Sequence, residues 1–199
     1  MTKVIISTWV FALLGFTSSD TGLTKSERAF AVKKLENSRN QLLTVLNGLS
    51  EKQLNYKSSS SSWSVAECVE HIAIFENEVF DIIKESLALP ASPERRKDIK
   101  YSDKKLLVRI ADRTKKEKTQ EGLKPHRKYG NHDATVKEFQ IKRAKHIYYV
   151  KTTKDDLRNH FVGFGALDAY QIILYMSAHT IRHIKQIKEI KAHKNFPKK

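Results

Sequence analysis

The chain contains little of the residue types that build turn-rich or disulfide-linked folds. Its 199 residues include only 7 glycines, 4 prolines and one cysteine, Cys68. So few helix-breaking residues favour long helices over a β fold with many turns. A single cysteine excludes an intrachain disulfide and a zinc site built from several thiolates. A chain of this length suits one domain with one hydrophobic core.

Long hydrophobic runs are also scarce, and the one candidate lies at the N-terminus. Lys3 precedes a mostly apolar run, Val4–Phe16, which the small residues Thr17–Ser19 follow. This run is too short to span a bilayer as a helix, and no second run has membrane length. We expect either a signal peptide over residues 1–19, and hence an exported or periplasmic protein, or an N-terminal helix or strand docked on a cytoplasmic domain.

Positive charge is abundant and unevenly placed. The formal net charge is +15, and the basic excess lies mainly in residues 84–128 and 182–199. Such a balance permits binding to nucleic acid or to an anionic membrane surface. The first segment, however, lacks regularly interleaved aromatic residues and a recognisable nucleic-acid motif. We therefore expect a solvated, mobile loop there and do not favour nucleic acid as a partner.

Helical periodicity and capping sequences predict four long helices. Two capping boxes, Thr24-Lys-Ser-Glu27 and Ser64-Val-Ala-Glu67, mark the starts of the first and the second helix. The second helix should end before Pro90 because proline cannot continue it. The third and fourth helices are predicted from Asp133 to about Asn159 and from Asp168 to about Ala192.

The pattern as a whole predicts an all-α four-helix bundle with one long crossover connection. A short helix over Asp103–Arg113 interrupts an otherwise irregular stretch, residues 91–132. The expected domain covers residues 24–192, and residues 193–199 form a basic tail.

Histidine, with 8 copies, is the abundant soft-to-borderline metal ligand of the chain. His179 and His183 are four residues apart, which places both rings on one face of the fourth helix. His71 lies among core-type residues of the second helix and should point towards the bundle interior. Such a pair taken alone is more often two buried, hydrogen-bonded histidines, so the spacing leaves both interpretations open.

Two longer motifs resemble the DinB-like superfamily. The segment Trp63-Ser-Val-Ala-Glu-Cys-Val-Glu-His71-Ile is similar to that family's second-helix signature, in which a histidine stands eight residues after a tryptophan. The segment that runs from Phe164-Gly-Ala-Leu-Asp-Ala-Tyr170 to Ser177-Ala-His179-Thr-Ile-Arg-His183-Ile-Lys-Gln186-Ile resembles its fourth helix. Gly48–Leu54 resembles the first interhelical turn, and the similarity extends over residues 25–191.

The resemblance implies that His71, His179 and His183 bind one divalent ion, usually zinc, nickel or iron. Family members with assigned activities are mostly thiol-dependent. They transfer a low-molecular-weight thiol such as bacillithiol, mycothiol or glutathione, or they isomerise substrates with a thiol cofactor. Three protein ligands leave a coordination position open. We therefore expect a metal-dependent transferase or hydrolase that uses a metal-activated thiol or water, with a small-molecule substrate or thiol as partner. Two alternative functions remain open: a non-catalytic, stress-associated metal-binding protein, and a basic nucleic-acid or membrane-surface binder. The protein could also form a homodimer.

Several further residues are candidates for supporting roles. An acidic or tyrosine side chain should hold the imidazoles by hydrogen bonds, although each candidate is more often a cap, a surface residue or a core aromatic. Cys68 and Trp63 are expected to be core residues rather than site residues, and His160 to make a structural hydrogen bond. The supporting candidates are Glu67, Glu70, Glu76, Tyr170 and Tyr175.

Overall fold

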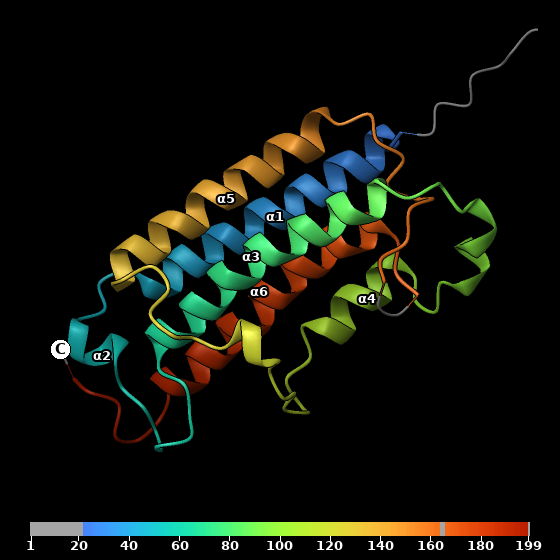
Figure 1. The fold of residues 1–199 in the computed structure, drawn as a ribbon. Coiled ribbons are helices and arrows are strands. Elements are labelled where there is room, and N and C mark those ends of the chain that lie inside the picture. The colour runs from blue at the N-terminus through green and yellow to red at the C-terminus, as the bar shows by residue number, and fades with distance from the viewer. Residues whose placement is uncertain (1–21, 164–165, 199) are drawn as a thin grey trace, which may run out of the picture.

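The computed structural model describes residues 22–163 and 166–198, and the regular secondary structure of these residues is helical (Figure 1). Within these ranges the only β contact is an isolated bridge between Phe161 and Asp168, so the predicted all-α class is confirmed. Residues 1–19, where a signal peptide was expected, lie outside the described residues, as do Phe164 and Gly165 of the fourth-helix motif. The long helices are α1 (Lys25–Leu46), α3 (Val65–Leu87), α5 (His132–Thr152) and α6 (Ala169–Lys191).

The helix starts follow the capping sequences. Thr24 and Glu27 form a complete capping box at α1, and Ser64 and Glu67 form another at α3. At α6 the Asp168 side chain accepts a hydrogen bond from the backbone N–H of the third helical residue. These bonds satisfy N–H groups that a helix leaves unpaired at its N-terminus, which is why the sequence located these boundaries well.

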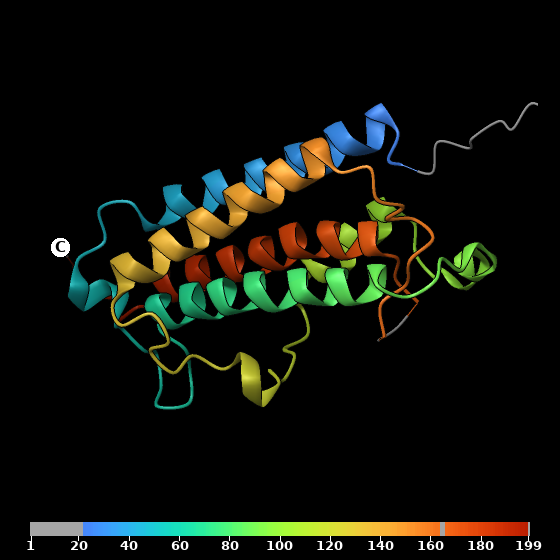
Figure 2. The same ribbon diagram turned by 45° about the horizontal axis from the view of Figure 1, so that its top comes forward.

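The four long helices form two layers. α1 contacts α5 and α6, and α3 contacts the same two helices. In the view of Figure 2, α1 and α5 lie above α3 and α6. Two apolar clusters fill the interior, one around Leu35 and Tyr170 and the other around Leu42 and Phe139. Among residues 22–163 and 166–198 no helix is both long and apolar enough to cross a bilayer.

Helix α5 ends at Thr152, seven residues before the predicted end at Asn159. The hydroxyl groups of Tyr149 and Thr153 both donate to the carboxylate of Asp155, at 2.6 Å each. The guanidinium group of Arg28 donates to the carbonyls of Val150 and Thr153. The Arg28 bonds supply carbonyl partners that another helical turn would have supplied. The bonds to Asp155 hold the chain just after Thr152, so the helix ends early.

The connection between α3 and α5, residues 88–131, is mostly irregular but contains three short helical elements. It contains the 3-10 turns η1 (Pro93–Asp98) and η2 (Glu121–Leu123) and the short helix α4 (Asp103–Ile110). Helix α4 packs along α6. The predicted short helix is thus present but ends three residues before Arg113. A further one-turn helix, α2 (Glu51–Leu54), follows α1.

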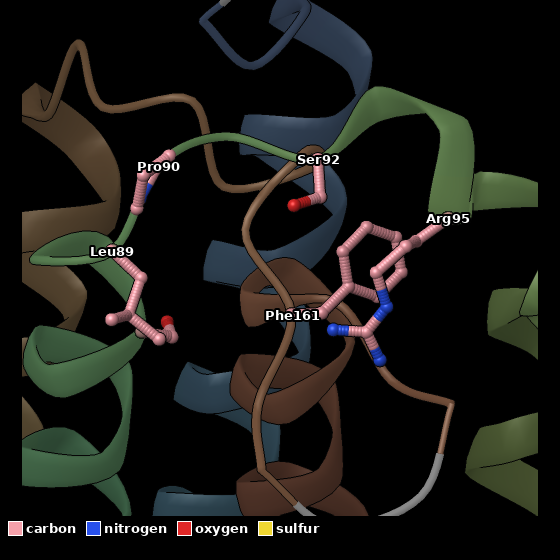
Figure 3. A pocket seen from close by; sticks show the side chains of 6 residues that line it. Leu89, Pro90, Ser92, Arg95 and Phe161 are labelled. Atoms are coloured by element: carbon pink, nitrogen blue, oxygen red, sulfur yellow. The ribbon is translucent and has the colours of Figure 1, made fainter.

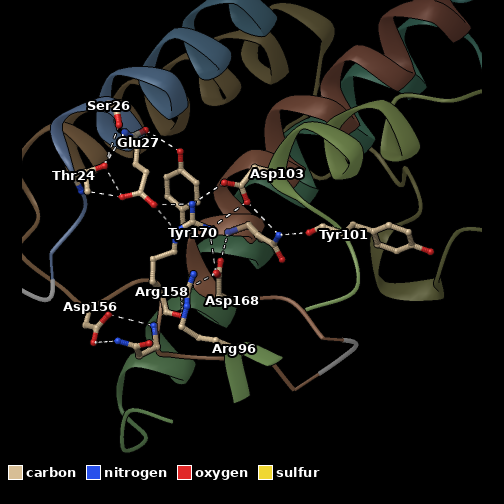
Figure 4. A network of polar contacts seen from close by, with 12 residues as sticks. Thr24, Ser26, Glu27, Arg96, Tyr101, Asp103, Asp156, Arg158, Asp168 and Tyr170 are labelled. Atoms are coloured by element: carbon tan, nitrogen blue, oxygen red, sulfur yellow. Dashed lines mark hydrogen bonds and ion pairs between the residues drawn. The ribbon is translucent and has the colours of Figure 1, made fainter. Parts of the chain in front are cut away.

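A polar network around Arg158 attaches the α3–α5 connection to the helix ends (Figure 4). The Arg158 guanidinium donates to Asp103 at 2.6 Å, to Glu27 at 2.8 Å and to Asp168 at 3.2 Å. Burial acts to raise the pKa of the Asp103 carboxyl, but the hydrogen bond and charge of Arg158 outweigh burial and lower it. The start of α4 is therefore held against the starts of α1 and α6.

A second polar cluster lies in the core and touches every long helix. Arg143 of α5 is fully buried, and its Nε and Nη2 atoms donate to the two carboxylate oxygens of Glu76 of α3 at 2.5 and 2.7 Å. The same guanidinium donates to Ser38 of α1 at 2.7 Å and to Thr180 of α6 at 3.0 Å. His146 Nδ1 also donates to Glu76, at 2.9 Å. A charged pair in the core is tolerated because each of its polar atoms has a partner.

Replacing Glu76 by glutamine should destabilise the protein strongly, because it leaves the Arg143 charge buried without a counter-ion. We expect the free energy of unfolding to fall by about 3–5 kcal/mol. Urea denaturation followed by circular dichroism measures this loss. The control is Glu138→Gln, which breaks a surface pair with Lys142 and should cost less than about 0.5 kcal/mol. Equal losses in the two variants would contradict the assigned role of the buried pair.

Candidate metal centre

The structure brings together the three histidines that the sequence singled out. His71 projects from α3, and His179 and His183 project from α6, and all three are buried. The Nε2 atom of His179 lies 3.2 Å from Nε2 of His71 and 3.1 Å from Nε2 of His183. Three nitrogen atoms from two packed helices therefore face one point and can hold a metal ion.

Aromatic side chains fix the positions of the imidazole rings. The Phe75 ring stacks on His179 with centroids 4.0 Å apart. Trp63 lies with its ring centroid 4.9 Å from that of His71 and 6.1 Å from that of His183. Trp63 thus packs against the core, as expected, but also forms part of the wall of the site.

Two of the histidines have their outer nitrogen engaged. His71 Nδ1 donates to the backbone carbonyl of Leu123 at 2.7 Å, and His183 Nδ1 donates to Oε1 of Gln186 at 2.9 Å. Both acceptors are carbonyl oxygens, so each Nδ1 carries the proton and each Nε2 keeps a free lone pair. His179 Nδ1 is buried and has no hydrogen-bond partner in the described part of the chain. The tautomers of His71 and His183 are those that a metal site requires.

The spacing of the nitrogen atoms fits a divalent ion. Zinc–nitrogen bonds of about 2.0–2.1 Å in tetrahedral geometry place two ligand nitrogens about 3.3 Å apart, and octahedral geometry places them about 3.0 Å apart. The observed separations of 3.2 and 3.1 Å from His179 lie between these two values. Both separations from His179 are therefore compatible with a shared ion, and the ligand atoms of all three residues lie within 4.8 Å of one another.

Burial keeps the three imidazoles neutral. Desolvation is the largest cause that lowers the pKa of each ring, and it lowers the pKa of His183 to about 3. Mutual repulsion among the three rings lowers the pKa of His179 further. Because a proton competes with a metal for the same lone pair, neutral rings favour metal binding near neutral pH.

The α3–α5 connection supplies the outer hydrogen bonds of the site. Leu123 belongs to η2, and its carbonyl holds His71. The Gln186 oxygen that holds His183 also accepts a hydrogen bond from Arg113 at 3.2 Å, and Arg113 is paired with Glu189 at 2.7 Å. A segment predicted to be solvated therefore determines how two of the rings are oriented.

The residues that we expected to hold the imidazoles have other partners. Glu67 caps α3 and pairs with Lys57, and Tyr175 lines the site without a hydrogen bond to a histidine among the described contacts. Sequence reasoning missed Gln186 in this role, although its position three residues after His183 places it on the same helix face. Glu70 accepts from the backbone of His126 and Lys128, Glu76 pairs with Arg143, and Tyr170 donates to the carbonyl of Glu27.

A cavity of about 1350 Å³ lies beside the three histidines. Cys68 is absent from its lining and is buried in the core, where burial raises the pKa of its thiol. His160 makes the expected structural hydrogen bond, to the carbonyl of Ser86. A smaller hollow of about 290 Å³ lies where Arg95 covers the Phe161 ring, and its described lining has no histidine, cysteine or carboxylate (Figure 3).

Replacing Gln186 by leucine should weaken metal binding, because it removes the acceptor that orients His183 while keeping the side chain's size. We expect the affinity for zinc to fall by about 10–100-fold. Competition with a chromophoric chelator measures this change. The matched control is Lys188→Gln, on an exposed position of the same helix, and should leave the affinity unchanged. Equal zinc affinities in the Gln186 variant and wild type would show that Gln186 does not support the site.

Comparisons with known proteins agree with this architecture. A family model described as the DinB superfamily matches residues 34–187, a range that contains all three histidines. The chain is also similar to the uncharacterized protein YuaE of Bacillus subtilis (strain 168), with 29% identity over 152 residues, which are 73% of this chain and 88% of that protein. No solved structure gives a significant match. Since the family match covers most of its length, the chain belongs to the DinB superfamily.

Proposed function

We propose that the protein binds one divalent metal ion through the Nε2 atoms of His71, His179 and His183 and uses it in catalysis. The proposal includes a four-helix bundle with a long crossover connection as the scaffold, spanning residues 24–192. One observation carries it: the buried Nε2 atom of His179 lies 3.2 Å from that of His71 and 3.1 Å from that of His183, and the rings of His71 and His183 are held by their Nδ1 protons.

The donor set indicates which ions to expect. Imidazole nitrogen suits zinc, nickel and iron, whereas calcium and magnesium prefer oxygen ligands. The described residues place no carboxylate in the ligand cluster. Zinc, nickel or ferrous iron is therefore the proposed cofactor.

The arrangement favours a transferase or hydrolase. Three protein ligands leave a position open towards the cavity, where a substrate or a low-molecular-weight thiol has room. When bound there, the ion would lower the pKa of a thiol or water that it coordinates. The protein's own part is to hold the imidazoles in the correct tautomers, to exclude bulk water with Trp63 and Phe75, and to orient the substrate.

Replacing His179 and His183 together by alanine should abolish metal binding, because one histidine cannot hold the ion. Elemental analysis of purified protein should find about one ion per wild-type chain and close to none in the double variant. The matched control replaces His126 and His132, which lie outside the cluster, and should retain the wild-type content. Equal metal in wild type and the His179, His183 variant would contradict the proposal.

The cellular location would decide which nucleophile is used. We propose that residues 1–19 are a signal peptide and that residues 193–199 form a C-terminal tail. Low-molecular-weight thiols are chiefly cytosolic cofactors, so an exported protein would use water. N-terminal sequencing of protein taken from cells should find a mature chain that begins near Asp20. A chain that still begins at residues 1 or 2 would overturn the export proposal and favour a thiol.

A further inference from the structure

One wall of the cavity beside the histidines is apolar. On α3 the residues Phe75, Val79 and Ile82 follow His71 at helical spacing, and on α6 Ile172 and Tyr175 precede His179 in the same way. The strip extends eleven residues beyond His71, or about 16 Å along the helix. A ligand that reaches the histidines therefore has an extended apolar surface to lie against.

Another part of the cavity lining carries an excess of positive charge. Among the lining residues without an ion pair in the described contacts, five are basic: Arg109, Lys115, Lys116, Lys118 and Arg182. Three are acidic: Glu78, Asp112 and Glu117. Most of these basic residues belong to α4 and to the segment after it, which crosses from α6 towards η2. Part of the chain's basic excess therefore faces the cavity that contains the histidines.

Arg182 is the basic residue nearest to the histidines in sequence. It shares a helix face with Tyr175 and His179, at seven and three residues' distance. Its Nη2 atom donates to the backbone carbonyl of Lys115 at 2.6 Å, which holds the guanidinium group at the cavity. No carboxylate of the described residues forms an ion pair with it, and the more distant Asp112 and Glu189 compensate its charge only in part. Guanidinium groups bind carboxylates and phosphates through two parallel hydrogen bonds.

We propose that the cavity takes an organic anion with an apolar body. Its carboxylate or phosphate lies against Arg182 and the Lys115–Lys118 segment, and its apolar part lies on the strip formed by Phe75, Val79 and Ile82. The inference rests on the proposed metal site, because the ion would bind the reacting group of the same ligand. It narrows that function to one substrate class.

The size and position of the cavity support an organic ligand. Its volume of about 1350 Å³ exceeds the roughly 300–1000 Å³ that drug-sized ligands occupy, so a single inorganic anion would leave it mostly unfilled. The basic side chains line the same cavity as the apolar strip, which favours a small amphipathic anion over nucleic acid.

Matched probes test the charge and the apolar body separately. Zinc-loaded protein of measured metal content is titrated calorimetrically with 4-phenylbutyrate, with 3-phenylpropyl phosphate, with 4-phenylbutylamine and with butyrate. We expect at least one aromatic anion to bind about tenfold more tightly than both the amine and butyrate. The relative affinities of the two aromatic anions identify the acidic group.

Variants then locate the two contacts. Arg182→Gln should lower the affinity for the aromatic anion about tenfold without changing the metal content. The control Lys188→Gln should leave this affinity unchanged. Ile82→Ser should reduce the advantage of 4-phenylbutyrate over butyrate, because it removes apolar surface far from the histidines.

The outcomes separate this inference from the proposed function. Metal-loaded protein that binds the amine as tightly as the anions, that binds none of the probes, or that is insensitive to Arg182→Gln would overturn the inference and leave the metal site intact. Protein that takes up no metal would overturn the proposed function instead. The same titration of that protein would still test the anion preference, because the hydrogen bond from Arg182 to the Lys115 carbonyl involves none of the three histidines.

Discussion

The bidentate ion pair between Arg143 and Glu76 constrains the arrangement of the long helices. A buried guanidinium group is tolerated only where all its donors are satisfied, and here the acceptors come from α1, α3 and α6. A shift of one helix along its axis would leave a charge unpaired. Glu76 lies five residues after His71 on α3, and Thr180, which accepts from Arg143, adjoins His179 on α6. The contacts of Arg143 therefore also fix how α3 and α6 are positioned along their axes where the imidazoles meet.

The metal centre depends on more than the two helices that carry its histidines. The Leu123 carbonyl orients His71, and Arg113 supports the Gln186 side chain that orients His183. Leu123 and Arg113 belong to the connection between α3 and α5. The Arg158 network attaches this connection to the other end of the bundle. The connection therefore acts as a structural part of the site, and its sequence would influence how tightly the proposed ion is held.

The uneven charge of the chain acquires a physical meaning in this arrangement. A net charge of +15 says little about function by itself. The structure places several of these charges, among them Arg182 and Lys115, on the wall of the cavity that also contains the histidines. Neutral imidazole ligands leave the charge of a divalent ion uncompensated, so the ion and the basic wall would attract the same anionic group.

The sequence by itself determined the features that depend on local chemistry. Capping boxes fixed the starts of α1 and α3, and the four-residue spacing placed His179 and His183 on one face, because both effects act within a few residues. Only the tertiary structure decided the early end of α5, the buried partner of Glu76 and the roles of Leu123 and Gln186. The Glu76–Arg143 pair, the Leu123 contact and the Arg28 bonds at the end of α5 join groups distant in sequence, which helical periodicity cannot pair. Gln186 and Asp155 act locally, but their side-chain bonds depend on how the chain is placed around them.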